Sequence, residues 1–287
     1  MLSYPMVREV TIMGAGGKMG CRITDQLKED KTYDMHYVEP SDVGQERLAE
    51  RGLEAEPASE ALPGSDTVIM AVPDELIGTI TEEIVPRLDE GTLVVLLDPA
   101  AAYAGEMQLR EDLSYFLAHP AHPSFETAET RISDDETDWF GGQGRDEQDI
   151  ICALHHGPEE SYEEGVAIAE DFYAPVRHTH RLTTEQMALL EPALVETLQA
   201  TCIDVIQEGL EEVVDRGVPE EAAREFLLGH FRIEFGIIFG FTDFPLSDGA
   251  QEAVEEAKKD IFKSNWKETV FDQENLEEST QRIATPE

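Results

Sequence analysis

The chain has 287 residues, of which 41% are hydrophobic, so it can bury a core in one large domain or two ordinary ones. Its 62 acidic residues outnumber 21 Lys and Arg, which gives a formal net charge of −41. Such a surface repels nucleic acid and acidic membranes, and no apolar run is long enough to span a bilayer. We therefore expect neither a nucleic-acid nor a membrane partner. The chain start lacks the pattern of a signal peptide, so we expect a cytoplasmic protein.

The same charge bears on the solvent in which the protein works. Self-repulsion at this density destabilises a compact fold, whereas molar salt shortens the Debye length to about 3 Å and screens the repulsion. The composition therefore predicts a halophilic source, with an acidic protein from ordinary salt as the alternative.

The first 182 residues alternate between strand-like and helix-like segments. In chain order, the predicted strands are 7–13, 35–38, 67–72, 93–97, 115–118, 150–154 and 176–180, and the predicted helices between them are 21–28, 45–51, 74–88 and 159–172. This alternation predicts a Rossmann-type, doubly wound parallel sheet that is covered on both faces. Between the fifth and sixth strands, the acidic stretch 126–149 is interpreted as a long loop and a candidate lid.

From residue 183 the pattern changes to long helices. Thr183 or Thr184 caps a predicted helix that continues to Arg216 and is kinked by Pro192. The next helix opens at Pro219 and is apolar nearly all round, which is typical of a helix covered on every side, here most simply by a partner subunit. Two further helices are predicted to begin at Ser247 and Asp272. We therefore predict an all-helical domain over 183–287 that forms a homodimer.

A glycine-rich turn follows the first strand and precedes the first helix. In the segment VTIMGAGGKMG, glycines stand at 14, 16, 17 and 20, one residue longer than the usual G-x-G-x-x-G spacing. Glycine lets the backbone approach a diphosphate, and the helix N-terminus offers N–H donors and positive potential. The predicted cofactor-binding residues of this turn are Gly14, Ala15, Gly16, Gly17, Lys18, Met19 and Gly20.

The ends of three further strands extend this predicted cofactor site. Glu39 ends the second strand, where a carboxylate accepts hydrogen bonds from ribose hydroxyls and repels a 2′-phosphate, which favours NAD over NADP. Val72 and Pro73 end the third strand and are expected to line the cofactor, because ligands of open parallel sheets bind at the carboxyl ends of strands. Asp98 ends the fourth strand, where the alternative role is to cap the next turn.

Histidines and glutamates provide the candidate chemistry. His119 and His122 lie on a proline-stiffened turn after the fifth strand and can act as base, acid or metal ligands. Glu191 stands in an apolar context near Pro192, and a buried carboxylate needs a partner, a proton or a metal. The remaining catalytic candidates are Glu196, His230 and Glu234. His230 and Glu234 share one helix face, so they form either a metal-binding or acid–base pair or an ordinary buried pair.

Several segments, taken together, resemble one family over nearly the whole chain. They are similar to segments of the phosphogluconate-dehydrogenase-like family that includes D-apionate oxidoisomerase. The segments are GAGGKMG, VEP, AVPDELIG, LLDPAAAYAG, FLAHPAHP, TTEQMALLEPALVETLQATC and FLLGHFRIEFGIIFG. This family is related to ketol-acid reductoisomerase and 6-phosphogluconate dehydrogenase. The resemblance implies a Rossmann domain with a helical, dimerising C-terminal domain. It also implies carbohydrate metabolism, with NAD oxidising a branched sugar acid while a carbon substituent shifts.

The resemblance places His119 and Glu191 at the reacting centre, with a divalent metal such as Zn²⁺ or Mg²⁺. One departure is informative: no lysine lies between Lys31 and Lys258, where 6-phosphogluconate dehydrogenase carries its catalytic lysine. A lysine acid–base mechanism is therefore not expected.

The working hypothesis is an NAD-dependent oxidoreductase for a small acidic substrate, a hydroxy or sugar acid, with oxidation coupled to isomerisation if a metal is bound. Two alternatives stay open. One is a dehydrogenase for prephenate or another 2-hydroxy acid, and the other is a non-catalytic NAD-binding sensor.

Overall fold

The computed structural model describes residues 7–124, 140 and 146–285. Two compact units make up the chain. The first comprises Met1–Pro192 together with Glu277–Glu287, and the second comprises Ala193–Leu276.

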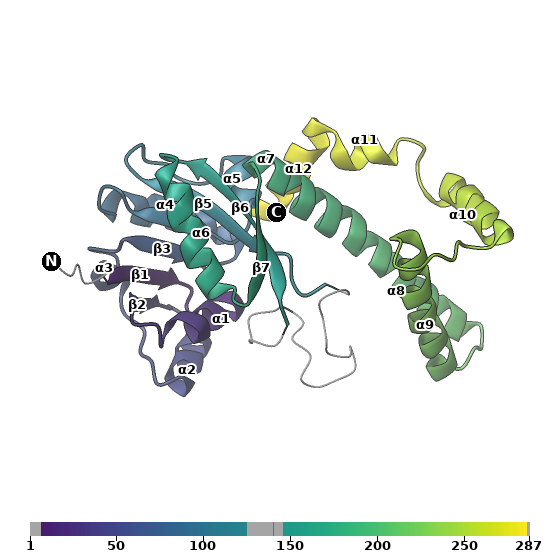
Figure 1. Cartoon of the computed structure of the whole chain (residues 1–287), viewed down its shortest axis with the longest axis horizontal. Helices are drawn as coiled ribbons and strands as arrows, with labels where there is room; N and C mark the ends of the chain where they lie inside the picture. Colours follow the sequence, from purple (N-terminus) through teal and green to yellow (C-terminus); the bar gives the residue numbers. More distant parts are fainter. Residues whose placement is uncertain (1–6, 125–139, 141–145, 286–287) are drawn as a thin grey trace. The chain divides into compact units, whose positions relative to one another are not determined.

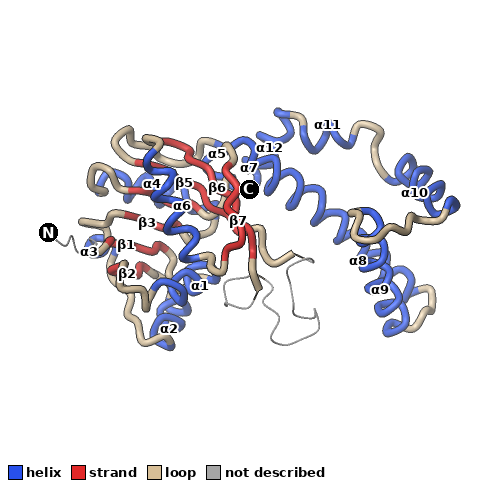
Figure 2. Tube along the Cα trace, viewed as in Figure 1, coloured by secondary structure: helices blue, strands red, loops and turns tan. Residues whose placement is uncertain are grey.

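The first unit is built on one seven-stranded sheet with the order β2-β1-β3-β4-β5-β6-β7 (Figures 1 and 2). The chain leaves β1 toward β2 and then crosses to β3 on the other side of β1, which makes the carboxyl edge there a topological switch point and a binding crevice. The strands are β1 (Arg8–Met13), β2 (Tyr33–Val38), β3 (Thr67–Met70), β4 (Leu93–Leu96), β5 (Ser114–Pro120), β6 (Gln148–His156) and β7 (Val176–Arg181).

Strand β6 departs from the parallel sheet that the sequence predicts, while the pairs among β1 to β5 keep that direction. It runs antiparallel to β5, with Phe116 beside Leu154, whereas β7 runs parallel to β6. Parallel neighbours need a crossover connection, usually a helix, but antiparallel neighbours do not. No helix was predicted between these two strands, so the sequence already carried this signal. The predicted loop over 126–149 also ended too late, because β6 begins at Gln148. Most of that candidate lid, 126–139 and 141–145, lies outside the described residues.

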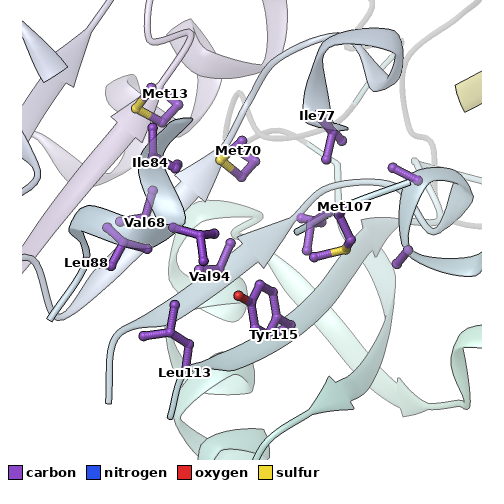
Figure 3. Close-up of a cluster of buried hydrophobic side chains, with 14 of the residues drawn as sticks. Met13, Val68, Met70, Ile77, Ile84, Leu88, Val94, Met107, Leu113 and Tyr115 are labelled. Carbon is purple, nitrogen blue, oxygen red and sulfur yellow. The ribbon is translucent and has the colours of Figure 1, made fainter. Parts of the chain in front are cut away.

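Helices cover both faces of the sheet, as the predicted doubly wound fold requires. One buried cluster joins Val68, Val94 and Tyr115 of the sheet to Ile77 and other residues of α4, α5 and α7 (Figure 3). The opposite face packs against α1, α2 and α6. The helices of this unit are α1 (Lys18–Leu27), α2 (Asp42–Glu50), α3 (Ala58–Ala61), α4 (Asp74–Ile84), α5 (Ala100–Ala104), α6 (Glu160–Phe172) and α7 (Thr184–Ala188), and α12 (Gln273–Ala284) ends in it.

The second unit is helical throughout its regular structure. The chain enters it through helices that begin in the first unit, where Thr183 caps α7 with a capping box, as predicted. After α7 the chain continues through a π-helix, Leu189–Gln199, that contains Pro192. Proline cannot donate the backbone hydrogen bond of a regular α-helix, so the predicted kink takes the form of a π-helical segment. The other helices are α8 (Ala200–Asp215), α9 (Glu220–Ile238), α10 (Asp248–Ile261) and α11 (Trp266–Phe271). Within the described part of the chain, no helix is long and apolar enough to cross a membrane.

Candidate active site

The glycine turn lies between β1 and α1 and is shaped by close backbone contacts. Gly14 has φ +77°, a conformation that favours glycine, and its N–H donates to the Val38 carbonyl at 2.8 Å. A Cβ on Gly20 would lie 2.1 Å from the Gly14 oxygen, so only glycine lets α1 start this close to the strand. Gly17 is the N-cap of α1 and makes no side-chain cap. The first N–H groups of α1 are therefore the natural donors for a diphosphate.

Glu39 contacts this turn directly. The residue is only 8% exposed, and its Oε2 accepts the Gly16 N–H at 2.9 Å. Its Oε1 accepts the N–H and the hydroxyl of Ser41, at 2.9 and 2.7 Å. Ser41 in turn caps α2. The acid at the end of β2 is thus held in place beside the glycine turn, where the ribose of a bound dinucleotide lies in Rossmann folds.

The end of β3 brings an acid that the sequence reasoning did not single out. Val72 packs on the glycine turn, since a Cβ on Gly14 would lie 2.9 Å from its Cγ1. Asp74 begins α4 directly after Pro73. Burial and the nearby Asp98 carboxylate raise the pKa of Asp74 to about 7. Its place at the carboxyl end of a central strand was the signal available in the sequence.

His119, Asp98 and Glu191 come together from three separate segments. One ligand atom from each lies within 4.8 Å of the other two. The Nε2 of His119 is 3.6 Å from a Glu191 oxygen, and its Nδ1 is 3.7 Å from an Asp98 oxygen. Nδ1 also lies 2.7 Å from the Leu97 carbonyl, to which it donates as N–H, so Nε2 is the ring nitrogen that faces Glu191. Asp98 additionally accepts the Ala100 N–H at 2.8 Å, so it caps the following turn as well.

His122 stands beside this cluster in an unusual backbone conformation. It has φ +59°, which is uncommon for a residue with a side chain and marks functional sites more often than others. Its Nδ1 lies 2.8 Å from the Phe140 carbonyl, and its ring centroid is 6.1 Å from that of His119. The Lys18 ammonium in turn lies 3.1 Å from the centre of the Phe140 ring. Burial lowers the pKa of His122, which favours a neutral imidazole that can accept a proton.

Three predicted catalytic residues belong to the second unit and remain predictions. Glu196 follows Pro192 within the π-helix. His230 and Glu234 are exposed on α9, and the His230 ring stacks on Phe226 with its Nδ1 near the Phe226 carbonyl, at 2.8 Å.

Fold and site together define the class: a nicotinamide-dinucleotide-dependent oxidoreductase built on a Rossmann sheet. Residues 6–130 match the model of the acetohydroxy acid isomeroreductase, NADPH-binding domain, and residues 128–284 match the phosphogluconate dehydrogenase (decarboxylating) C-terminal model.

Similar proteins narrow the class. The D-apionate oxidoisomerase of Cupriavidus necator is 45% identical over 279 residues, covering 97% of this chain and all of that protein. The D-apionate oxidoisomerase of Rhizobium rhizogenes is 43% identical, covering 96% and 98%. The chain therefore belongs to the D-apionate oxidoisomerase family, within the phosphogluconate-dehydrogenase-like proteins.

Solved structures agree with this assignment. A semialdehyde dehydrogenase NAD-binding protein from Cupriavidus necator, solved in complex with calcium and NAD, superposes with a TM-score of 0.89 at 45% identity, covering 97% of this chain and all of that one. An NADH-preferring ketol-acid reductoisomerase from an uncultured archaeon shares the fold, with a TM-score of 0.67 at 18% identity over 96% and 81% of the two chains.

Proposed function

We propose that this chain oxidises a branched sugar acid of the D-apionate type with NAD and couples the oxidation to an isomerisation. The observation that carries the proposal is the meeting of Asp98, His119 and Glu191 at the carboxyl edge of the sheet, beside the glycine turn. Relatives at 35–45% identity, each named D-apionate oxidoisomerase, support the substrate class.

A divalent cation fits the donors of this site. Asp74, Asp98 and Glu191 contribute three carboxylates around one imidazole, and the raised pKa of Asp74 reflects both burial and an excess of negative charge. We assign Asp98, Glu191 and the Nε2 of His119 as the ligands, a nitrogen and oxygen set that suits Zn²⁺, Mn²⁺ or Mg²⁺. When bound, the cation would polarise the substrate oxygens and NAD would take the hydride.

The protein residues position the substrate and move its proton. His122 accepts the hydroxyl proton, because its lowered pKa keeps the ring neutral and its Nδ1–H is donated to Phe140, which leaves Nε2 free to accept. Leu97 holds the His119 ring through the Nδ1 hydrogen bond. The proposal also retains Glu196, His230 and Glu234 as candidate catalytic residues.

The test is NADH formation from D-apionate in molar KCl, with prephenate and simple 2-hydroxy acids as competing substrates. Glu191→Gln and His119→Asn are expected to lower turnover at least about 100-fold, the scale on which single catalytic groups act. The matched control is His178→Asn, an exposed histidine of β7 outside the cluster. Turnover of prephenate instead of D-apionate would favour the dehydrogenase alternative. NAD binding without any turnover would favour the sensor and refute the proposal.

The proposed assembly is a homodimer formed through the helical unit. We retain residue 183 as the proposed boundary between the dinucleotide-binding domain and the helical domain. Apolar side chains of α9 are exposed in the single chain, among them Phe226 at 69%, Ile233 at 57% and Ile238 at 66%. Large apolar side chains exposed together on one helix are typical of a surface covered by another subunit. Sedimentation in molar KCl is expected to show a dimer that Ile238→Asp dissociates, and a wild-type monomer would contradict this assembly.

The proposed setting is the cytoplasm of a salt-loving organism. The three cysteines are free, which suits a compartment that keeps thiols reduced. The net charge of −41 is tolerated best where salt screens it.

A further inference from the structure

A second group of metal-ligating side chains lies on β1 and β2, away from the glycine turn that follows β1. The two strands pair in parallel with Glu9 beside Asp34, and His36 lies two residues further along β2. Side chains two residues apart on a strand point to the same face, so the three share one face of the sheet. One ligand atom from each lies within 4.8 Å of the other two.

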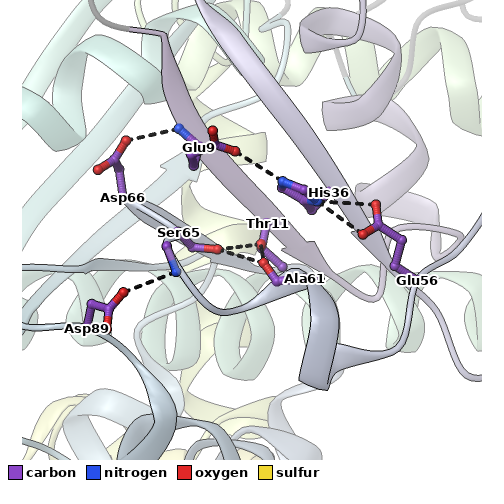
Figure 4. Close-up of polar contacts among 9 residues, drawn as sticks. Glu9, Thr11, His36, Glu56, Ala61, Ser65, Asp66 and Asp89 are labelled. Atoms are coloured by element: carbon purple, nitrogen blue, oxygen red, sulfur yellow. Dashed lines mark hydrogen bonds and ion pairs between the residues drawn. The ribbon is translucent and has the colours of Figure 1, made fainter.

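The ring of His36 is held between two carboxylates (Figure 4). Its Nδ1 lies 3.2 Å from both oxygens of Glu56, whose backbone N–H is fixed by the Tyr37 carbonyl at 2.7 Å. Its Nε2 lies 3.1 Å from Oε2 of Glu9. When Nδ1 donates its N–H to Glu56, the Nε2 lone pair faces another acceptor, and that contact is favourable only with a cation or a proton between the two atoms. A carboxylate on the far nitrogen is also the arrangement that orients metal-ligating histidines.

The charge of this group favours a cation over a proton. Even with a protonated ring, the three carboxylates of Glu9, Asp34 and Glu56 leave two negative charges. Among the described residues, the ion pairs of Glu9 and Glu56 are those with His36. A divalent ion in place of the proton brings one more positive charge to the same point.

We propose that Glu9, Asp34 and the Nε2 of His36 bind a divalent cation of the Zn²⁺ class, with Glu56 orienting the imidazole and water completing the coordination. One imidazole and two carboxylates suit such an ion, and the ring is only partly exposed. Glu9 precedes Gly14 by five residues along β1, about 17 Å at the rise of a strand, so the site is separate from the reaction centre. Its role is structural, because the ion joins β1, β2 and the segment of Glu56.

The test is calorimetric titration of chelator-treated protein with Zn²⁺ in molar KCl, where nonspecific binding to acidic surface is screened. The double variant His119→Asn/Glu191→Gln serves as the background, because it removes the cation proposed for the reaction centre. The double variant is expected to keep one Zn²⁺ site. Adding His36→Gln to the double variant is expected to abolish that site. Glu56→Gln is expected to keep the stoichiometry but weaken affinity about 10–100-fold, as loss of an orienting partner does. His178→Gln is the matched surface control.

A second readout is the unfolding temperature in the same background. It is expected to rise with Zn²⁺ concentration, since an ion that binds only the folded state stabilises it, and His36→Gln is expected to abolish the rise. An unchanged stoichiometry in His36→Gln overturns the proposal. If that variant does not fold by circular dichroism, Glu9→Gln and Asp34→Asn replace it, and undiminished Zn²⁺ binding in both has the same consequence. If the wild type and the double variant bind the same number of Zn²⁺ ions, the cation proposed for the reaction centre is refuted. The site on β1 and β2 is not affected by that result.

Discussion

Replacing Gly16 by alanine disturbs a close backbone contact between the cofactor turn and α2. The added Cβ would lie 2.3 Å from the carbonyl oxygen of Gly44 in α2, whereas ordinary contact begins at 3.4 Å. The turn and α2 must therefore separate by about 1 Å, which also stretches the bonds of Gly16 to Glu39 and Arg47. Overpacking of this kind costs about 1–3 kcal/mol. Because Gly16 leads directly into α1, whose first N–H groups are expected to receive the diphosphate, we expect a loss of NADH affinity of about 5–150-fold, at 1.4 kcal/mol per tenfold.

The assay is fluorescence titration with NADH in molar KCl, together with urea unfolding of each variant. Gly209→Ala in α8 is the control glycine, because nothing lies within 4 Å of a Cβ added there. Gly209→Ala is expected to bind NADH within about threefold of the wild type, since each threefold corresponds to roughly 0.7 kcal/mol. Equal NADH affinity and equal unfolding midpoints in Gly16→Ala and the wild type would refute the reasoning, because α2 would then not limit the space at this turn.

Three further predictions concern charge. Glu39→Ala is expected to weaken NAD binding and to raise NADP binding relative to NAD by about tenfold or more, because the carboxylate that repels a 2′-phosphate is gone; an unchanged ratio in paired titrations would contradict its assignment. Asp74→Asn is expected to stabilise chelator-treated protein, and more so as pH rises from 5 to 8. The reason is that the folded-state pKa of Asp74, raised to about 7, makes ionisation above pH 4 costly only in the folded state. Urea unfolding at both pH values measures this, and a pH-independent difference would count against it. The unfolding temperature of the wild type is expected to rise from 0.1 M to molar KCl, as scanning calorimetry can show, because salt screens the net charge of −41; a flat response would count against the halophilic assignment.

Local signals in the sequence determined much of the first unit. The glycine turn, the strand before it and the acid at the end of β2 are properties of short segments, because strand patterning, φ > 0 and helix capping depend on a few neighbouring residues. Accordingly, Gly14, Glu39 and the cap at Thr183 are found where the sequence predicted them. Residues at strand ends could also be assigned to one edge of the sheet, which indicated His119. The structure differs only in placing His119 within the last residues of β5, beside Ile151, and not after the strand.

The tertiary structure decided what depends on contacts between distant segments. The resemblance already placed His119 and Glu191 together, and the sequence offered Asp98 as a cofactor residue. Only the packing of the π-helix start and of the end of β4 near His119 brings oxygens of both acids around one imidazole. Asp74 was overlooked because its raised pKa arises from burial and from Asp98, which local patterning does not reveal. The pairing of Glu9 with Asp34 likewise follows from strand register. Register is set by the whole sheet, because each strand's pairing depends on how all its neighbours bury their side chains.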